Sequence, residues 1–165
     1  MTITKRARQA AAVIAAAITA AAVSIPPAYG DNKRLNDGVV ANVYTIQRQA
    51  GCHGELRINK QLQLAAEWHS RDVLANRSLD GDVGSDDSTP RDRAAAAGFR
   101  GTVAETIAIN PALAINGLEV LNMWYANPAY LQIMQNCRYT EMGVWSENAL
   151  DRTALVATYG DPTPA

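Results

Sequence analysis

Five carboxylates lie within one short stretch, SLDGDVGSDDSTPRDR (residues 78–93), in a chain otherwise rich in alanine. Closely spaced carboxylates suggest a calcium loop, and Asp80-Gly81-Asp82 begins in the manner of an EF-hand. That motif needs an oxygen ligand at its fifth position and a glutamate at its twelfth, which here are Gly84 and Arg91. We therefore expect no EF-hand. Two interpretations stay open: turns followed by a helix start, or a role for Asp82 alone in a cleft.

Hydrolytic chemistry with a serine or cysteine nucleophile commonly needs a histidine base, and the chain has two histidines. His69 lies on the apolar stripe of an expected helix, where a core histidine is the simpler interpretation. His53 follows Cys52, so a thiol nucleophile is possible only if Cys52 forms no disulfide. Cys52 and Cys137 are the two cysteines of the chain, and export would favour a disulfide between them over two buried thiols.

The first 30 residues have the pattern of an export signal. Three basic residues precede an apolar run over 10–23, and Ala28 and Gly30 suit cleavage before Asp31. The run is shorter than a bilayer span needs, and no later segment is expected to cross a membrane. The sequence thus predicts a signal peptide at 1–30, one domain over 31–160 and a flexible tail at 161–165.

The expected mature chain is acidic and of single-domain size. Residues 31–165 are enough for one core but not for two. The leader holds three of the 15 Lys and Arg residues, which leaves 12 against 16 Asp and Glu and a net charge of −4. We therefore expect no nucleic-acid partner, and we expect a monomer.

Helical and strand patterns are mixed without regular alternation. Helices are expected over 31–49, 59–76, 90–97 and 112–125 with a further turn from Pro128, and strands over 102–109, 139–146 and 154–159. The last two strands flank a turn-like segment at 147–151 and predict a hairpin. This order favours an α+β fold with a small, mostly antiparallel sheet covered by helices.

The alternation of side chains in the first expected strand places one carboxylate on its apolar face. In the first expected strand, Glu105 shares a face with Val103 and Ile107. A carboxylate among branched apolar side chains is either partly buried or directed into a cleft.

Taken in order, several segments resemble the CAP superfamily of cysteine-rich secretory and pathogenesis-related proteins, in its small bacterial exported form. The similar segments lie at 59–69, 84–98, 104–108, 124–130 and 141–145. The resemblance spans about residues 35–160 and implies a three-layer α-β-α sandwich. In that family the central cleft often holds two histidines and one or two glutamates, a set that can bind a divalent metal. The fold alone does not imply this chemistry.

When the family's cleft residues are placed on this sequence position by position, neither cleft histidine is found. The first cleft histidine falls on Asp82 and the second on Tyr130, whereas the glutamate is kept as Glu105 and the family's serine is Asn127. Neutral imidazole is the ligand that makes a zinc site of such a cleft, so we predict no zinc and no other cofactor. Asp82 and Glu105 remain a weak alternative site for Ca²⁺ or Mg²⁺. A histidine found in the cleft beside Glu105 would instead favour an active metalloprotein.

These observations predict a secreted or envelope-associated bacterial protein that binds an unidentified ligand without catalysis through a degenerate cleft. Two alternatives stay open. One is a carboxylate-based or metal-dependent hydrolase using Glu105 and Asp82. The other is a lipid or sterol carrier, for which a groove could be lined by Leu118, Leu121, Met123, Ile133 and Met134, although these serve equally as core. Trp68, Trp124 and Trp145 are expected to pack in the core.

Overall fold

A computed structural model describes residues 29–163, with side chains from Asn32 onward, so nearly all of the expected signal peptide lies outside the described residues. Its centre is a four-stranded sheet in the order β1-β3-β4-β2. β3 (Glu141–Ala149) and β4 (Arg152–Pro162) form a hairpin, and β2 (Gly101–Asn110) pairs antiparallel with β4 over its whole length. β1 (Arg57–Ile58) pairs parallel with the start of β3.

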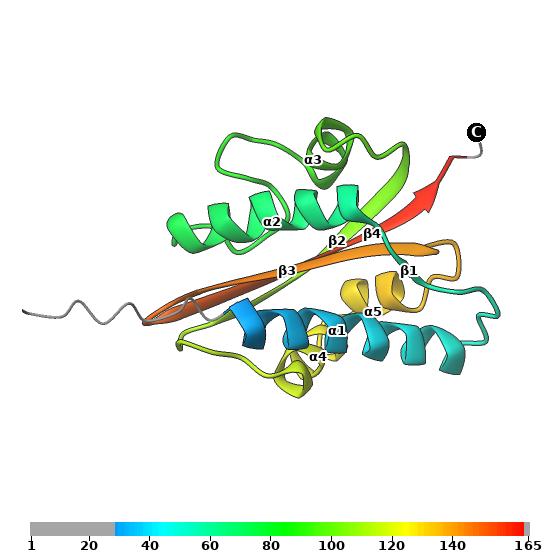
Figure 1. Ribbon diagram of the computed structural model, residues 1–165, viewed down its shortest axis with the longest axis horizontal. Coiled ribbons are helices and arrows are strands. Elements are labelled where there is room, and N and C mark those ends of the chain that lie inside the picture. Colours follow the sequence, from blue (N-terminus) through cyan, green and yellow to red (C-terminus); the bar gives the residue numbers. More distant parts are fainter. Residues whose placement is uncertain (1–28, 164–165) are drawn as a thin grey trace, which may run out of the picture.

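Helices cover both faces of this sheet (Figure 1). α2 (Lys60–Ala75) and α3 (Pro90–Ala96) pack on one face, and α1 (Tyr29–Gln49), α4 (Gly117–Tyr125) and α5 (Pro128–Met134) pack on the other. The predicted α+β class and the three-layer α-β-α sandwich with a mostly antiparallel sheet are therefore confirmed.

Beyond shifts of one or two residues, the structure differs from the prediction in three ways. α4 begins at Gly117 instead of 112, because Asn116 and Glu119 form a capping box that fixes its first turn. The hairpin turn is Leu150–Asp151 alone, since both strands extend further than their apolar patterns. β1 was not predicted, because two exposed residues carry no periodicity.

The larger core lies between the sheet and α1, α4 and α5, and a smaller one lies under α2 and α3. Trp124 is fully buried in the larger core, where its indole N–H donates to the Ile107 carbonyl at 2.9 Å. Trp145 packs half-buried against the smaller one. Trp68 is 39% exposed, so the prediction that it packs in the core is wrong. It lies on α2 beside a surface hollow, which its sequence spacing does not reveal.

A disulfide between Cys52 and Cys137 joins the end of α1 to the segment before β3, as predicted. The two residues are 85 positions apart, so the bond closes a loop that contains most of the domain. Because both sulfurs are in the bond, Cys52 has no thiol with which to form a nucleophile pair with His53.

The start of α2 lies directly against β3 at a glycine. A Cβ at Gly143 would overlap the backbone of Leu62 and Gln63. Just before α2, Asn59 donates its N–H to the Met142 carbonyl at 2.9 Å, and its side chain caps the helix. The layer formed by α2 and α3 therefore packs on the sheet through a close contact between two backbones, which a residue larger than glycine at position 143 would prevent.

We expect Gly143→Ala to lower the free energy of unfolding by about 3 kcal/mol, because the added methyl group meets backbone and not a flexible side chain. Gly38→Ala is the matched control. It lies in α1 with nothing near its Cβ position, and should stabilise by about 0.5 to 1 kcal/mol. Urea denaturation of both variants measures the difference, and equal stability of Gly143→Ala and the unchanged protein would contradict this packing.

Candidate functional site

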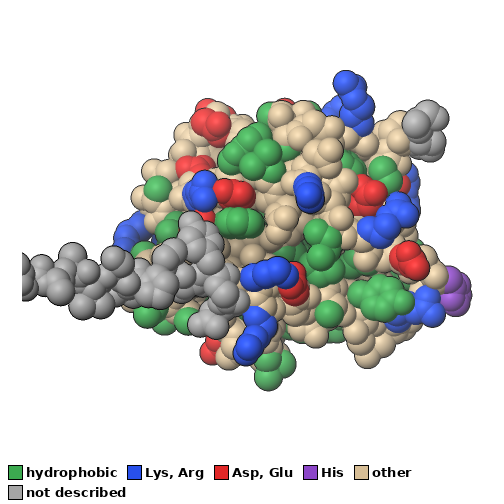
Figure 2. Space-filling model, in the orientation of Figure 1, with side chains coloured by type: hydrophobic (Ala, Val, Ile, Leu, Met, Phe, Trp, Pro, Cys, Tyr) green, Lys and Arg blue, Asp and Glu red, His purple; other side chains and the backbone are tan. Residues whose placement is uncertain are grey.

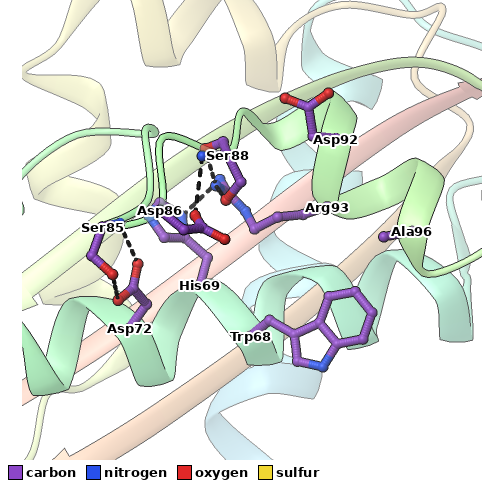
Figure 3. A pocket seen from close by; sticks show the side chains of 9 residues that line it. All are labelled: Trp68, His69, Asp72, Ser85, Asp86, Ser88, Asp92, Arg93 and Ala96. Atoms are coloured by element: carbon purple, nitrogen blue, oxygen red, sulfur yellow. Dashed lines mark hydrogen bonds between the residues drawn. The ribbon is translucent and has the colours of Figure 1, made fainter.

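The acidic stretch that follows α2 is mainly a folded loop and a helix start. Asp86 accepts a hydrogen bond from the Ser88 N–H at 3.0 Å, and Asp92 forms a capping box with Thr89 at the start of α3. From α2, Asp72 accepts from the N–H of Ser85 at 2.7 Å and from its hydroxyl at 2.6 Å, as Figure 3 shows. These carboxylates therefore shape the loop.

Beneath this loop lies a buried polar network centred on Glu105 of β2. Its Oε1 lies 2.5 Å from Nδ1 of His69 on α2 and 2.9 Å from the guanidinium of Arg93 on α3. Its Oε2 accepts from the Thr158 hydroxyl of β4 at 3.1 Å. The side chains of Glu105 and His69 are fully buried and that of Arg93 is 6% exposed. The strand parity therefore placed Glu105 correctly on the inner face, and its carboxylate is fully buried.

The charges around His69 fix which nitrogen carries the hydrogen. A guanidinium nitrogen of Arg93 lies 3.0 Å from Nδ1, and this nitrogen is itself a donor. The carboxylate of Glu105 accepts only. The same Arg93 nitrogen already donates its two hydrogens to the Asp82 carbonyl and to Glu105. Nδ1 therefore carries its own hydrogen and donates to Glu105, and Nε2 is buried with no hydrogen-bond partner among the described residues.

Arg93 also fastens the acidic loop to this network. Its guanidinium donates to the carbonyl of Ser88 at 2.6 Å and to that of Asp82 at 2.7 Å. One side chain thus holds the loop, the start of α3 and the buried carboxylate together. The sequence alone did not reveal Arg93 or His69 as partners of Glu105. The inward position of His69 on its helix was the one available signal.

Three of the four predicted cleft residues meet at one cavity. A hollow of about 430 Å³ at the β2 edge of the sheet is lined by Asp82, Glu105 and Tyr130, together with residues of the loop and of α5. Asn127 is not part of it, because its side chain caps α5 by accepting from the N–H groups of Ala129 and Tyr130. Asp82 is exposed at the rim, whereas the carboxylate of Glu105 is fully enclosed by its donors.

Tyr130 lies half-buried in this hollow. Burial raises the pKa of its phenol, and the negative charges of Asp82 and Glu105 raise it further, against a backbone hydrogen bond with Ile107 that lowers it. The phenol therefore stays neutral at physiological pH and can donate a hydrogen bond.

His69 lies beside Glu105, but it does not line this hollow. It lines a separate cavity of about 460 Å³ with Trp68, Asp72 and Arg93, on the α2–α3 side of the loop (Figure 3). A histidine in the cleft beside Glu105 would favour a metalloprotein. His69 lies beside Glu105 but outside the hollow, so this condition is met only in part. Over residues 29–163, no group of three or more His, Cys, Asp or Glu side chains is placed to hold a metal ion. The residues at Glu105 do not fit one, because Arg93 already supplies the positive charge.

Comparison with known structures identifies the fold. An outer surface protein of Borrelia burgdorferi aligns with a TM-score of 0.66 and 16% identity, over 77% of this chain and 92% of that one. An extracellular protein containing an SCP domain from Bacillus anthracis aligns with a TM-score of 0.62 and 18% identity, over 83% and 45%. The chain has the fold of the SCP domain.

A cysteine-rich secretory protein of Staphylococcus aureus shares this SCP fold, with a TM-score of 0.53 and 16% identity over 76% of this chain and 39% of that one. The chain spans less than half the length of the Bacillus and Staphylococcus proteins. No protein-family model and no curated protein matches the sequence. The predicted resemblance to the CAP superfamily is confirmed at the level of the fold.

Glu105→Gln should lower the free energy of unfolding by about 3 to 5 kcal/mol, because it leaves the buried Arg93 without a countercharge. Glu55→Gln, an exposed carboxylate in the loop after α1, is the control and should change stability by less than about 0.5 kcal/mol. Chemical denaturation at neutral pH compares them. Similar small effects of both variants would show that Glu105 is not the anchor of this network.

Acid should loosen the loop through Asp72. Burial raises the pKa of Asp72, but hydrogen bonds from Ser85 and Asn76 outweigh it and hold the pKa below its ordinary value. A lowered folded-state pKa contributes stability above the unfolded pKa of about 3.9 that disappears as pH falls through the folded value. Asp72→Asn should therefore be less stable than the unchanged protein at pH 7, with the difference shrinking towards pH 2 in denaturation measurements. A difference independent of pH would contradict this role.

Proposed function

We propose that the protein is exported and acts, without catalysis, as a binding protein of the bacterial cell envelope or exterior. The observation that carries this proposal is the state of Glu105, the one carboxylate kept from the family's cleft. Three donors on three different elements surround it, and solvent does not reach it. A general base or a nucleophile must contact substrate or water, so this carboxylate is in no position to act as either.

The remaining groups of the hollow offer little for hydrolysis. Asp82 is exposed at the rim, and the phenol of Tyr130 is held neutral. A divalent cation placed against Glu105 would meet the guanidinium of Arg93, 2.9 Å from the same oxygen. The proposal therefore assigns no cofactor, and it treats the hollow as a remnant of the family's cleft.

Export is supported by the pattern of the first 30 residues and by the disulfide, which is typical of oxidising compartments. Between residues 29 and 163, no helix is both long and apolar enough to cross a bilayer. The names of three proteins with this fold describe them as outer surface, extracellular and secretory.

Lipid carriage is the weaker alternative, because the residues considered for its groove differ widely in burial. Met134 is fully buried in the larger core, and Leu121 and Ile133 pack against it, whereas Leu118 is 68% and Met123 39% exposed on α4. Met134 therefore serves as core and cannot line a groove.

The exported protein should hydrolyse no peptide, ester or peptidoglycan substrate at a rate that Asp82→Asn or Tyr130→Phe lowers. Calcium and magnesium should leave its melting temperature unchanged. Both variants alter side chains at the hollow and leave the Glu105 network in place, so they test chemistry apart from folding. Turnover that is lost in either variant, or a cation-induced rise in melting temperature that Asp82→Asn removes, would establish the enzyme or metal-site alternative instead.

A further inference from the structure

The outer edge of β3 has no paired strand for most of its length. β1 pairs only with Glu141 and Met142, whereas β3 continues to Ala149. A cavity of about 460 Å³ lies along this edge, with walls from α1, α2 and β3 and with Ile58 of β1 at one end. In Figure 1, β3 runs between α2 and α1 on this side of the molecule, and Figure 2 shows the surface in the same orientation.

Hydrogen bonds to neighbouring elements identify which residues of β3 face this edge. The N–H of Asn59 donates to the carbonyl of Met142 at 2.9 Å. In a strand the N–H and C=O of one residue point to the same side, and the side alternates from residue to residue. The backbone groups of Val144, Ser146 and Asn148 therefore face the open edge, and those of the residues between them pair with β4.

Side-chain amides already take some of the places of a neighbouring strand. Gln63 of α2 donates to the carbonyl of Val144 at 3.5 Å, and Asn32 of α1 donates to the carbonyl of Ser146 at 3.1 Å. The N–H groups of Val144 and Ser146 point to the same edge, beyond the end of β1. Val144 and Ser146 are each 2% exposed beneath these side chains, so an added strand has to displace the two amides before it pairs with the main chain.

Two buried polar atoms at the wall of this cavity have no hydrogen-bond partner within the described part of the chain. They are Oδ1 of Asn36, a residue 7% exposed, and Oγ of Ser146, a residue 2% exposed. An unpaired buried polar group costs free energy, and a ligand could pair with these two atoms only after the side chains that cover them move.

The other surroundings are apolar or neutral. Trp145 and the 55% exposed Ile58 give the groove an apolar side. The charged residues at its rim are paired, Lys33 with Asp37 at 2.5 Å and Glu147 with Arg71 at 3.0 Å. The groove therefore offers no net charge to a ligand.

We propose that this groove binds an uncharged, extended peptide segment of another protein, which joins the sheet as a strand beside β3. Five residues, Val144 to Asn148, extend over about 13 Å at about 3.3 Å per residue, so the bound segment has about five residues. Its side chains alternate: apolar ones contact Trp145 and Ile58, and small hydroxyl or amide ones face α1, where Asn36 and Ser146 become partners once the side chain of Asn32 is displaced. This inference gives the proposed binding function a ligand class and rests on it.

A second copy of the chain does not fit the same groove. Its own β3 edge lies between its α1 and α2, so two such edges cannot approach to strand-pairing distance, about 4.8 Å. A single free strand meets no such obstacle.

The probe is a phage library of random eight-residue peptides, selected on the exported protein and then synthesised. Selected peptides should alternate apolar and small polar residues. They should slow the amide hydrogen exchange of Val144 and Ser146, measured by NMR, and leave Gly143 and Trp145 unchanged. Ile58→Glu should weaken binding at least tenfold. Leu118→Glu, which changes a more exposed apolar residue on α4, should not weaken it.

The proposal is overturned if no peptide is selected, if both variants bind equally, or if the amides of Val144 and Ser146 are already protected in the isolated protein. It is also overturned if the protein forms a dimer that Ile58→Glu dissociates, since the occupant is then a second copy. Each of these results leaves the non-catalytic role intact. Cleavage of the selected peptides that Asp82→Asn abolishes would instead overturn the proposed function.

Discussion

The ion pair between Glu105 and Arg93, with His69 and Thr158 completing it, is the constraint on which the candidate site depends. A buried carboxylate is tolerated only with countercharge and donors, and here these come from α2, α3 and β4 around a residue of β2. The network thereby fixes how the upper helical layer sits on the sheet. It also encloses the carboxylate that the resemblance places in the cleft. The position of this helical layer and the burial of Glu105 have the same physical cause.

The surface loop depends on this arrangement as well. Arg93 binds the carbonyls of Ser88 and Asp82 with the same guanidinium that neutralises Glu105. The buried Arg93 side chain therefore fixes the position of Asp82 at the hollow. The carboxylate of Asp82 remains exposed at the rim of the hollow.

Much of the fold could be predicted, because its signals are local. Asn59 and Thr89 are caps with side-chain oxygens in the expected places, and the alternation around Glu105 correctly gave its face in β2. The partners of Glu105 could not be predicted, since His69 and Arg93 lie 36 and 12 residues away in sequence and meet it only when three elements pack. β1 was missed because its two residues form a strand only by pairing with β3 and have no sequence pattern of their own. Because β1 is so short, most of the outer edge of β3 has no paired strand, and no sequence pattern indicates this.

The order of the strands has a consequence for how the chain can assemble. β4 is the last element, yet it lies between β3 and β2 and forms both of the long ladders. Without it, β2 has no partner in the sheet. β3 and β4 pair as a local hairpin, whereas α4, α5 and β3 separate β2 from β4 in sequence, so we expect the ladder that joins β2 to the sheet to form later. A nascent chain that still lacks β4 therefore cannot complete its sheet.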